Sequence, residues 1–243
     1  MDYGLRFDVR IVFFGPPGTG KGSLALLCQT QLGLAHLSAG EIFRQEIARG
    51  TALGRRVARY VKGGRLVPDD LVVAVMVSRL PKRLLTKGFV LDGFPRTAKQ
   101  AEGLDRALAR KRAPLDAAIY VDSPRALLIR RLTGRRVCSR CGANYHIRTM
   151  RPKRAGLCDY CGGALVTRQD DQVRTIRKRL VVDHKTSTPL LNYYTRRSLL
   201  YRVNGIGHVD TVFQRTRDLF TRQGWLRDGA LRRHDRAQKR RRD

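Results

Sequence analysis

A glycine-rich segment near the start of the chain constrains the fold most. The sequence GPPGTGKGS at residues 15–23 follows an apolar, β-prone run at residues 9–14 and precedes a helical stretch at residues 21–32. In a strand–loop–helix unit of this kind the loop N–H groups point at an anion, the helix N-terminus adds partial positive charge, and the lysine reaches the terminal phosphates. We therefore expect Lys21 and its loop to bind a nucleoside triphosphate with magnesium.

The loop departs from the consensus GxxxxGK[ST] at one position. Gly22 stands where the hydroxyl residue belongs, and Ser23 follows one position later. Taken alone, the segment also fits a glycine-rich turn that binds no ligand. The rest of the chain has to decide between the two interpretations.

Short β-prone runs alternate with longer amphipathic segments along the chain, which favours a parallel sheet covered by helices. The expected strands are residues 9–14, 35–37, 89–92, 117–122 and 207–210. Two stretches interrupt the alternation. Residues 38–67 have the pattern of short helices separated by glycines, and residues 134–171 carry Cys, Gly and Pro with little helical period.

Four cysteines in the second interruption have the spacing of a metal site. They form two CxxC pairs with sixteen residues between them: Cys138, Cys141, Cys158 and Cys161. Each pair can give two thiolates to one tetrahedral zinc ion. Two disulfides or a redox site would use the same residues, but the first ten residues lack an export signal, which argues against disulfides. Four thiolates with no open position favour a closed structural zinc site.

Seven blocks in order show a resemblance to the adenylate kinase family of nucleoside monophosphate kinases, from Gly15 to about Phe220. After the glycine-rich loop they are HLSAGEIFR (36–44), GRLVPDD (64–70), GFVLDGFPRTAKQ (88–100), RRLTGRRVCSRCGANYH (130–146), TRQDDQVRTIRKRL (167–180) and PLLNYY (189–194). The resemblance is to the long form with a zinc-binding lid. It implies an α/β P-loop nucleoside monophosphate kinase fold, a five-stranded parallel sheet flanked by helices with two inserted mobile lobes.

The resemblance also divides the chain into parts. It implies a P-loop kinase core over residues 1–222, with a monophosphate-binding lobe inserted at 38–67 and a zinc-binding lid at 134–171. Residues 223–243 lie past the resemblance and are strongly basic. We expect this C-terminal tail to be disordered.

Transfer of a phosphoryl group between two nucleotides needs fixed positive charge around an in-line geometry, with water excluded. The resemblance places the catalytic charges at Lys21, Asp92, Arg96, Arg135, Arg168 and Arg179. It implies ATP contacts from Gly15, Pro16, Pro17, Gly18, Thr19, Gly20, Lys21, Gly22, Ser23, Arg131 and Arg135. It implies AMP contacts from Ala39, Arg44, Arg65, Leu66, Val67, Gly93, Arg96, Gln100, Arg168 and Arg179. It also implies that Ser23 offers the hydroxyl nearest to the magnesium ion and that Asp92 orients the ion through water.

Two residues point to different acceptors. Gln100 matches the residue that hydrogen-bonds the adenine of AMP, whereas Ala39 stands where adenylate kinases commonly have Thr and resembles UMP/CMP kinases. Gln100 and the long zinc lid together favour AMP, so we expect the reaction ATP + AMP to 2 ADP, in nucleotide homeostasis. Ala39 makes a UMP/CMP-type kinase one alternative. A kinase that uses GTP is another, because the turn that usually touches the donor adenine is altered after Asp210.

The chain is strongly basic, with 50 Lys and Arg against 20 Asp and Glu and a formal net charge of +30. Such charge attracts nucleic acid and other polyanions. It also arises when Arg accumulates on a solvated surface, and no base-reading motif accompanies it here. We expect weak polyanion binding through the basic surface and tail. A nucleic-acid-binding protein on a kinase-like fold is the alternative from another class.

Apolar runs in this sequence fall short of the about 18 residues that a membrane-spanning helix needs. Together with the missing export signal, this predicts a soluble, cytoplasmic protein that contacts no membrane. Family members of this length are usually monomers, and we expect the same here.

Overall fold

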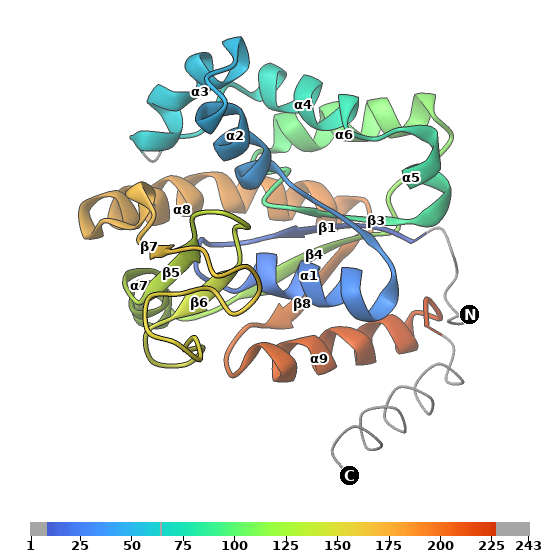
Figure 1. The fold of residues 1–243 in the computed structure, drawn as a ribbon. Coiled ribbons are helices and arrows are strands. Elements are labelled where there is room, and N and C mark those ends of the chain that lie inside the picture. Colours follow the sequence, from blue (N-terminus) through green and yellow to red (C-terminus); the bar gives the residue numbers. More distant parts are fainter. Residues whose placement is uncertain (1–8, 64, 227–243) are drawn as a thin grey trace.

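A parallel sheet of five strands forms the centre of the computed structural model, which describes residues 9–63 and 65–226 (Figure 1). The strands lie in the order β2-β3-β1-β4-β8. Their bounds are β1 (Arg10–Phe14), β2 (Ala35–Ser38), β3 (Phe89–Asp92), β4 (Ala117–Asp122) and β8 (Leu200–Asn204). The predicted fold class, an α/β protein with a five-stranded parallel sheet, is confirmed.

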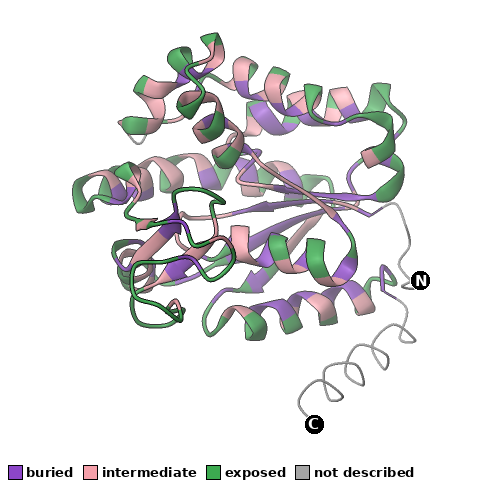
Figure 2. Ribbon diagram, in the orientation of Figure 1, coloured by how far each residue is buried: buried purple, intermediate pink, exposed green. Residues whose placement is uncertain are grey.

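Successive side chains of β1 enter two different cores. Ile11 and Phe13 pack on one face of the sheet, whereas Val12 and Phe14 pack on the other. Side chains alternate along a strand, and a parallel sheet covered on both faces buries both sets. This is why residues 11–14 form a continuous apolar run in the sequence, and why Figure 2 shows the central strands as buried.

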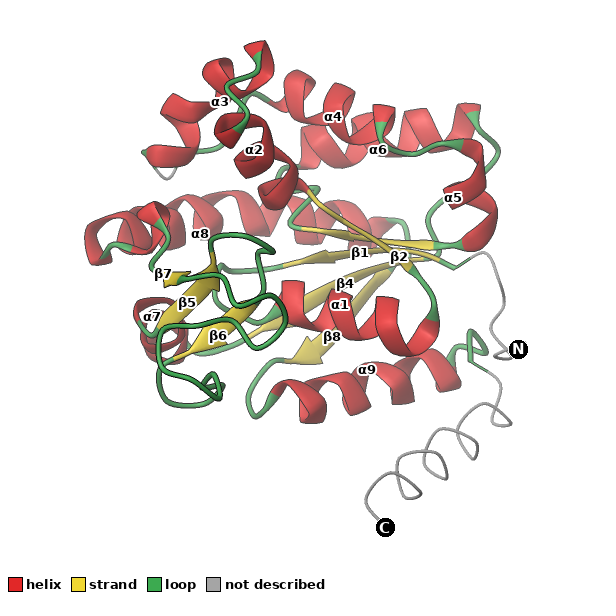
Figure 3. Cartoon of the chain, viewed as in Figure 1, coloured by secondary structure: helices red, strands yellow, loops and turns green. Residues whose placement is uncertain are grey.

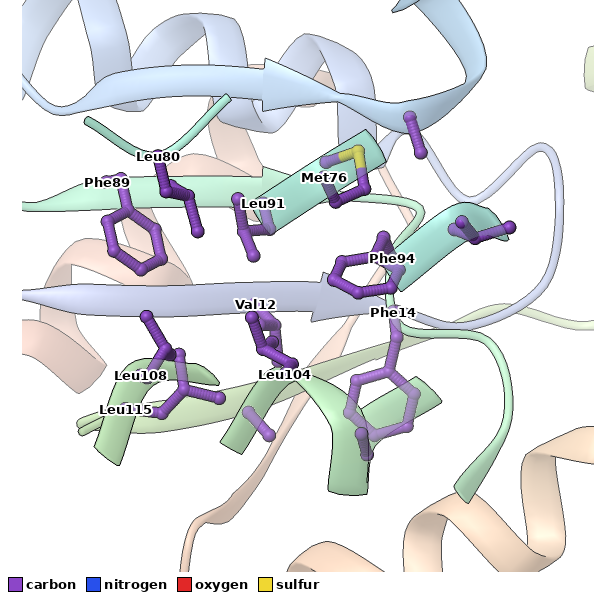
Figure 4. Close-up of a cluster of buried hydrophobic side chains, with 14 of the residues drawn as sticks. Val12, Phe14, Met76, Leu80, Phe89, Leu91, Phe94, Leu104, Leu108 and Leu115 are labelled. Carbon is purple, nitrogen blue, oxygen red and sulfur yellow. The ribbon is translucent and has the colours of Figure 1, made fainter. Parts of the chain in front are cut away.

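Helices cover both faces of the sheet (Figure 3). One face carries α1 (Lys21–Leu32) and α9 (Val209–Arg222). The larger core on the other face, part of which is drawn in Figure 4, contains side chains from α2 (Ala39–Ala48), α3 (Ala52–Lys62), α4 (Asp69–Ser78), α5 (Lys82–Lys87), α6 (Ala98–Arg110) and α8 (Val173–Arg196). The N-terminal part of α8 packs on α7 (Arg125–Thr133).

The two stretches predicted to interrupt the alternation form segments outside the central sheet. Residues 38–67 contain α2 and α3, separated by a turn at Gly50, which has a φ of 63°. Residues 134–171 contain a small antiparallel sheet in the order β6-β5-β7. Its strands are β5 (Arg135–Cys138), β6 (Asn144–His146) and β7 (Leu165–Val166), and a short helix η1 (Gln169–Asp171) follows.

The strand predicted at residues 207–210 is wrong. The fifth strand is β8, which is five residues long and pairs with β4 in the register Ala118↔Leu200. Glycines at 205 and 207 end it, and Asp210 lies in the first turn of α9. A carboxylate near a helix N-terminus is favoured by the helix dipole, so the short apolar pattern at 207–210 marks a helix start instead of a strand.

The core extends past the boundary expected at residue 222. Trp225 and Leu226 are buried, and the Trp225 ring packs against those of Tyr201 and Phe220 at centroid distances of 5.6 and 5.7 Å. The remainder of the predicted tail, residues 227–243, lies outside the described residues. In the part of the chain that the structure describes, no helix combines the length and the apolar character needed to cross a membrane.

Leu104, labelled in Figure 4, tests how much the larger core contributes to stability. Its side chain is fully buried on α6, whereas Leu26 on α1 is 49% exposed. We expect Leu104→Ala to lower the free energy of unfolding by about 2–5 kcal/mol, because it leaves a cavity. Leu26→Ala, the same chemical change on a helix surface, should alter it by less than about 1 kcal/mol. Urea unfolding of both variants measures the difference, and equal losses would contradict this assignment of the core.

Candidate active site

The glycine-rich loop wraps the end of β1 because three of its residues take backbone angles that favour glycine. Gly15, Gly18 and Gly20 have φ values of 127°, 92° and 94°. A side chain at Gly15 would also collide with the carbonyl oxygen of Val121 on β4. The loop therefore sits directly at the carboxyl ends of β1 and β4, with α1 starting at Lys21.

Lys21 is buried within the loop that it follows. Its Nζ donates hydrogen bonds to the carbonyl oxygens of Gly15 and Pro16, at 2.6 and 2.7 Å, and to Thr19 Oγ1 at 3.1 Å. Thr19 in turn donates to the Pro16 carbonyl. Burial lowers the pKa of Lys21 to about 8, although Asp92 acts to raise it. An anion bound in the loop would favour the charged form of Lys21.

Asp92 ends β3 beside the loop, and its position accounts for the unusual Gly22. A Cβ added at Gly22 would lie 3.2 Å from Asp92 Oδ2, so glycine leaves room for the carboxylate. His36 Nε2 is 3.7 Å from the same oxygen. Burial acts to raise the pKa of Asp92, but His36, Lys21 and Arg96 outweigh it, and the net pKa is below the ordinary value. Asp92 is thus an ionised carboxylate next to the loop.

Asp171 joins residues 134–171, the segment predicted to be a lid and called the lid below, to the long helix α8. The Asp171 side chain is fully buried. Its carboxylate accepts two hydrogen bonds from Arg135, at 2.7 and 2.6 Å. Arg179 Nη1 lies 3.2 Å from Asp171 Oδ1 and 2.9 Å from Asp170 Oδ2. Two predicted catalytic arginines, one from β5 and one from α8, are therefore held together by a pair of acids.

Other arginines crowd the same place. Burial lowers the pKa of three guanidinium groups, and Arg135 lowers it further in each. These are Arg44, Arg179 and Arg168, the last with a pKa of about 9. The lid and the segment 38–67 also meet, since a Cβ on Gly142 would lie 3.7 Å from Glu41 Oε1. A cluster of arginines of this kind is suited to binding anions.

Arg96 and Gln100 lie where β3 leads into α6. Arg96 Nε donates to the Gly93 carbonyl at 2.8 Å, and its backbone N–H donates to Gln100 Oε1 at 2.8 Å. Gln100 Nε2 donates to Asp69 Oδ1 at 2.8 Å. The side chain of the predicted base-binding residue is therefore engaged by protein groups at both ends.

The remaining predicted residues are spread around this centre. Ala39 and Val67 are buried in the larger core, while Leu66 is partly exposed. Arg65 is exposed, with its guanidinium 5.5 Å from the ring centre of Tyr60. Arg131 Nη1 and Nη2 donate to the carbonyls of Gly205 and Gly207, at 3.0 and 2.8 Å. Pro17 and Ser23 are partly exposed on the loop and first turn of α1.

The four cysteines of the lid come together as predicted. Their Sγ atoms all lie within 4.8 Å of one another. Cys138 Sγ lies 3.4 Å from Cys161 Sγ, and Cys141 Sγ lies 3.5 Å from Cys158 Sγ, so each of these contacts joins the two CxxC pairs. A tetrahedral zinc ion with Zn–S bonds of about 2.3 Å needs S–S separations of about 3.8 Å. The cluster has the residues and the spacing of a four-thiolate zinc site.

Sequence reasoning missed several residues at this site. Asp183 and Ser187, on α8, line a pocket together with Gly15, Gly93 and Arg96. Helical periodicity offered a signal, since Asp183 lies four residues, about one turn, after Arg179. His36 offered none, because its approach to Asp92 depends on the neighbouring strands β2 and β3.

Comparison with known proteins agrees with this geometry. The family profile described as adenylate kinase matches residues 13–199. An adenylate kinase from Moorella thermoacetica is 48% identical over 204 residues, covering 84% of this chain and 94% of the relative. Those from Symbiobacterium thermophilum and Clostridium tetani are 46% and 44% identical, over 84% and 85% of this chain and 94% and 95% of the relatives. With the fold and the cluster of cations in agreement, the chain belongs to the adenylate kinase family, and it is a nucleoside monophosphate kinase.

Proposed function

We propose that this chain catalyses the reversible, magnesium-dependent transfer of a phosphoryl group from ATP to AMP, giving two ADP. The observation that supports it most is the cluster of cations that Lys21 of the glycine-rich loop forms with arginines of α2, the lid and α8. Fixed cations of this kind stabilise the negative charge that spreads over the oxygens of the transferred group. The relatives named above are adenylate kinases, which supports the same reaction here.

Each cation has a role in this proposal. Lys21 binds the donor phosphates, together with the N–H groups of the loop. Arg44 and Arg96 bind the acceptor monophosphate. Arg135, Arg168 and Arg179 close over the phosphates from the lid and α8. Because the acceptor is already an anion, the reaction needs no general base.

Magnesium is proposed to arrive with the nucleotide, near Ser23 and Asp92. Hydroxyl and carboxylate oxygens are hard ligands of the kind that Mg²⁺ prefers. The lowered pKa of Asp92 keeps its carboxylate ionised beside the loop, and Gly22 leaves it room. When bound, the ion neutralises charge on the donor phosphates.

We also propose that residues 38–67 and 134–171 are mobile lobes that close over the two substrates. Arg44 belongs to the first and Arg135 to the second, and Arg135 lowers the pKa of Arg44 by repulsion. Bound phosphate would relieve that repulsion, so substrate favours the closed arrangement. Closure excludes water, which keeps the phosphoryl group from hydrolysis.

A coupled assay for ADP tests the proposed reaction. We expect activity with ATP, AMP and magnesium, and weaker or no activity with UMP, CMP or GTP in place of the matching substrate. Arg135→Ala should lower kcat by about 100-fold or more, because it removes a charge that stabilises the transition state. Arg222→Ala, an exposed arginine on the last turn of α9, is the control and should leave the rate unchanged. Inactivity of the wild-type enzyme toward AMP would contradict the proposal.

We propose that the four lid cysteines hold a structural zinc ion. Backbone N–H groups of Arg140 and Cys141 donate to Cys138 Sγ, each at 3.4 Å. Tyr145 donates from its hydroxyl to Cys158 Sγ at 3.5 Å. Donors of this kind stabilise thiolates that bind metal. The buried side chains around the cluster are few, so the lid depends on the ion for much of its stability.

Removal of zinc should therefore destabilise the lid. We expect one zinc ion per chain by elemental analysis, and a lower midpoint of thermal unfolding after treatment with a chelator. Zinc added back should restore the midpoint, whereas added magnesium should not. An unchanged midpoint in protein shown to have lost its metal would contradict a structural role.

We propose, as a secondary property, weak binding of polyanions to the exposed face of the lid. Its loops carry five exposed basic residues: Arg140, Arg148, Arg151, Lys153 and Arg154. Asp159 is the one acidic residue between positions 139 and 166. The exposed ring of Tyr160, at 82%, adds a surface on which a base can stack.

Salt dependence tests this surface. Binding of labelled single-stranded DNA, followed by fluorescence anisotropy, should weaken about 50-fold between about 50 and 200 mM salt if four phosphates are contacted. Replacing Arg148, Arg151, Lys153 and Arg154 by Ser should reduce that slope. Four matched replacements on α6 and the turn after it, at Arg106, Arg110, Lys111 and Arg112, serve as the control for net charge. Equal effects of the two sets would show that the binding is not specific to the lid.

A further inference from the structure

The amide of Gln100 is fixed at both ends by partners of opposite character. Its Oε1 accepts a hydrogen bond from the backbone N–H of Arg96, and its Nε2 donates to Asp69 Oδ1, both at 2.8 Å. A backbone N–H can only donate and an ionised carboxylate can only accept. The two partners therefore decide which way the amide faces, since a rotated amide would set oxygen against oxygen and N–H against N–H.

Asp69 is itself held in place. It lies in the first turn of α4, and its Oδ1 also accepts from Thr97 Oγ1 at 3.0 Å. Thr97 is the N-cap of α6 and accepts from the backbone N–H of Gln100 at 3.1 Å. This closed set of hydrogen bonds joins the starts of two helices, and Gln100 at its centre is 1% exposed. Hydrogen bonds in a buried network of this kind hold its side chains rigidly.

We propose that Asp69 is a positioning residue that makes the acceptor site select adenine, by holding the Gln100 amide in one orientation. The inference rests on the proposed function, in which Gln100 meets the base of AMP. Beyond its two protein contacts, the amide has one N–H and one lone pair of Oε1 left to offer. Adenine presents an acceptor at N1 and a donor at its amino group, so the two edges are complementary.

Hypoxanthine, the base of IMP, presents the inverse edge: a donor at N1 and an acceptor at O6. In the same pose it would need the amide to rotate, and Asp69 opposes that rotation. A site built to satisfy one pattern leaves buried polar groups unpaired with the other, which is a strong source of discrimination. The lack of a hydroxyl at Ala39 leaves this network with a larger share of the selection, since Ala39 is buried in the core and offers no side-chain polar atom.

The ratio of kcat/KM for AMP to kcat/KM for IMP tests the inference. The Asp69→Asn variant presents an amide that can either accept from or donate to Gln100, so only the backbone N–H of Arg96 still opposes rotation of the Gln100 amide. We expect the ratio to fall by tenfold or more, while KM for ATP changes little. Asp70→Asn is the matched control, because it makes the same chemical change one residue away, on a side chain that is 87% exposed and contacts only Lys99 among the described charged residues. Its ratio should stay within twofold of the wild-type value.

A purely structural role for Asp69 would lower the activity toward both substrates alike and leave the ratio unchanged. Thr97→Val gives a second, milder variant if Asp69→Asn folds poorly, because it removes one of the hydrogen bonds that hold Asp69. We expect a smaller fall of the ratio, about threefold. An unchanged ratio in a variant that still phosphorylates AMP overturns the inference and leaves the proposed function intact. Wild-type enzyme that phosphorylates no monophosphate would instead overturn the proposed function, and this inference with it.

Discussion

Repulsion among buried cations is the constraint on which the rest of the site depends. Lys21, Arg44, Arg168 and Arg179 all have pKa values lowered by burial, and each is also repelled by at least one neighbouring arginine. Charged groups are buried only where other charges or hydrogen bonds compensate for lost water. Asp92, Asp170 and Asp171 supply part of that compensation from the protein. Phosphate groups, which carry several negative charges, would supply the remainder.

The parallel sheet provides the rigidity that such a cluster needs. The loop that holds Lys21 and the end of β3 that holds Asp92 come from adjacent strands, paired in the register Phe13↔Asp92. Both strands are buried on both faces, and this packing fixes the backbone that carries the loop and Asp92. The arginines of the lid and α2, by contrast, come from segments outside the sheet. The molecule thus combines charges carried at the edge of the central sheet with charges carried by the two inserted segments.

The fold could be predicted from the sequence wherever a few neighbouring residues determine the local structure by themselves. The apolar run at residues 9–14, the glycines of the loop and the two CxxC pairs each encode their own geometry, and the structure agrees with all three. The pattern at 207–210 misled because four residues cannot distinguish a strand from the first turn of a helix. The fifth strand, β8, has an exposed Arg202 in its middle and therefore lacks a continuous apolar run.

Contacts between residues distant in the chain could not be read from the sequence. Gly22 looked like a weakness of the phosphate loop, yet its lack of a side chain admits the carboxylate of Asp92, seventy residues further on. In the sequence Asp69 is one of two acids that end the block GRLVPDD, and its place in the first turn of α4 is favoured by the helix dipole. Only the approach of α4 to α6 shows that it also holds Gln100. A residue chosen for one local reason can therefore acquire a second role through packing, and such second roles are where a structure adds most to a sequence.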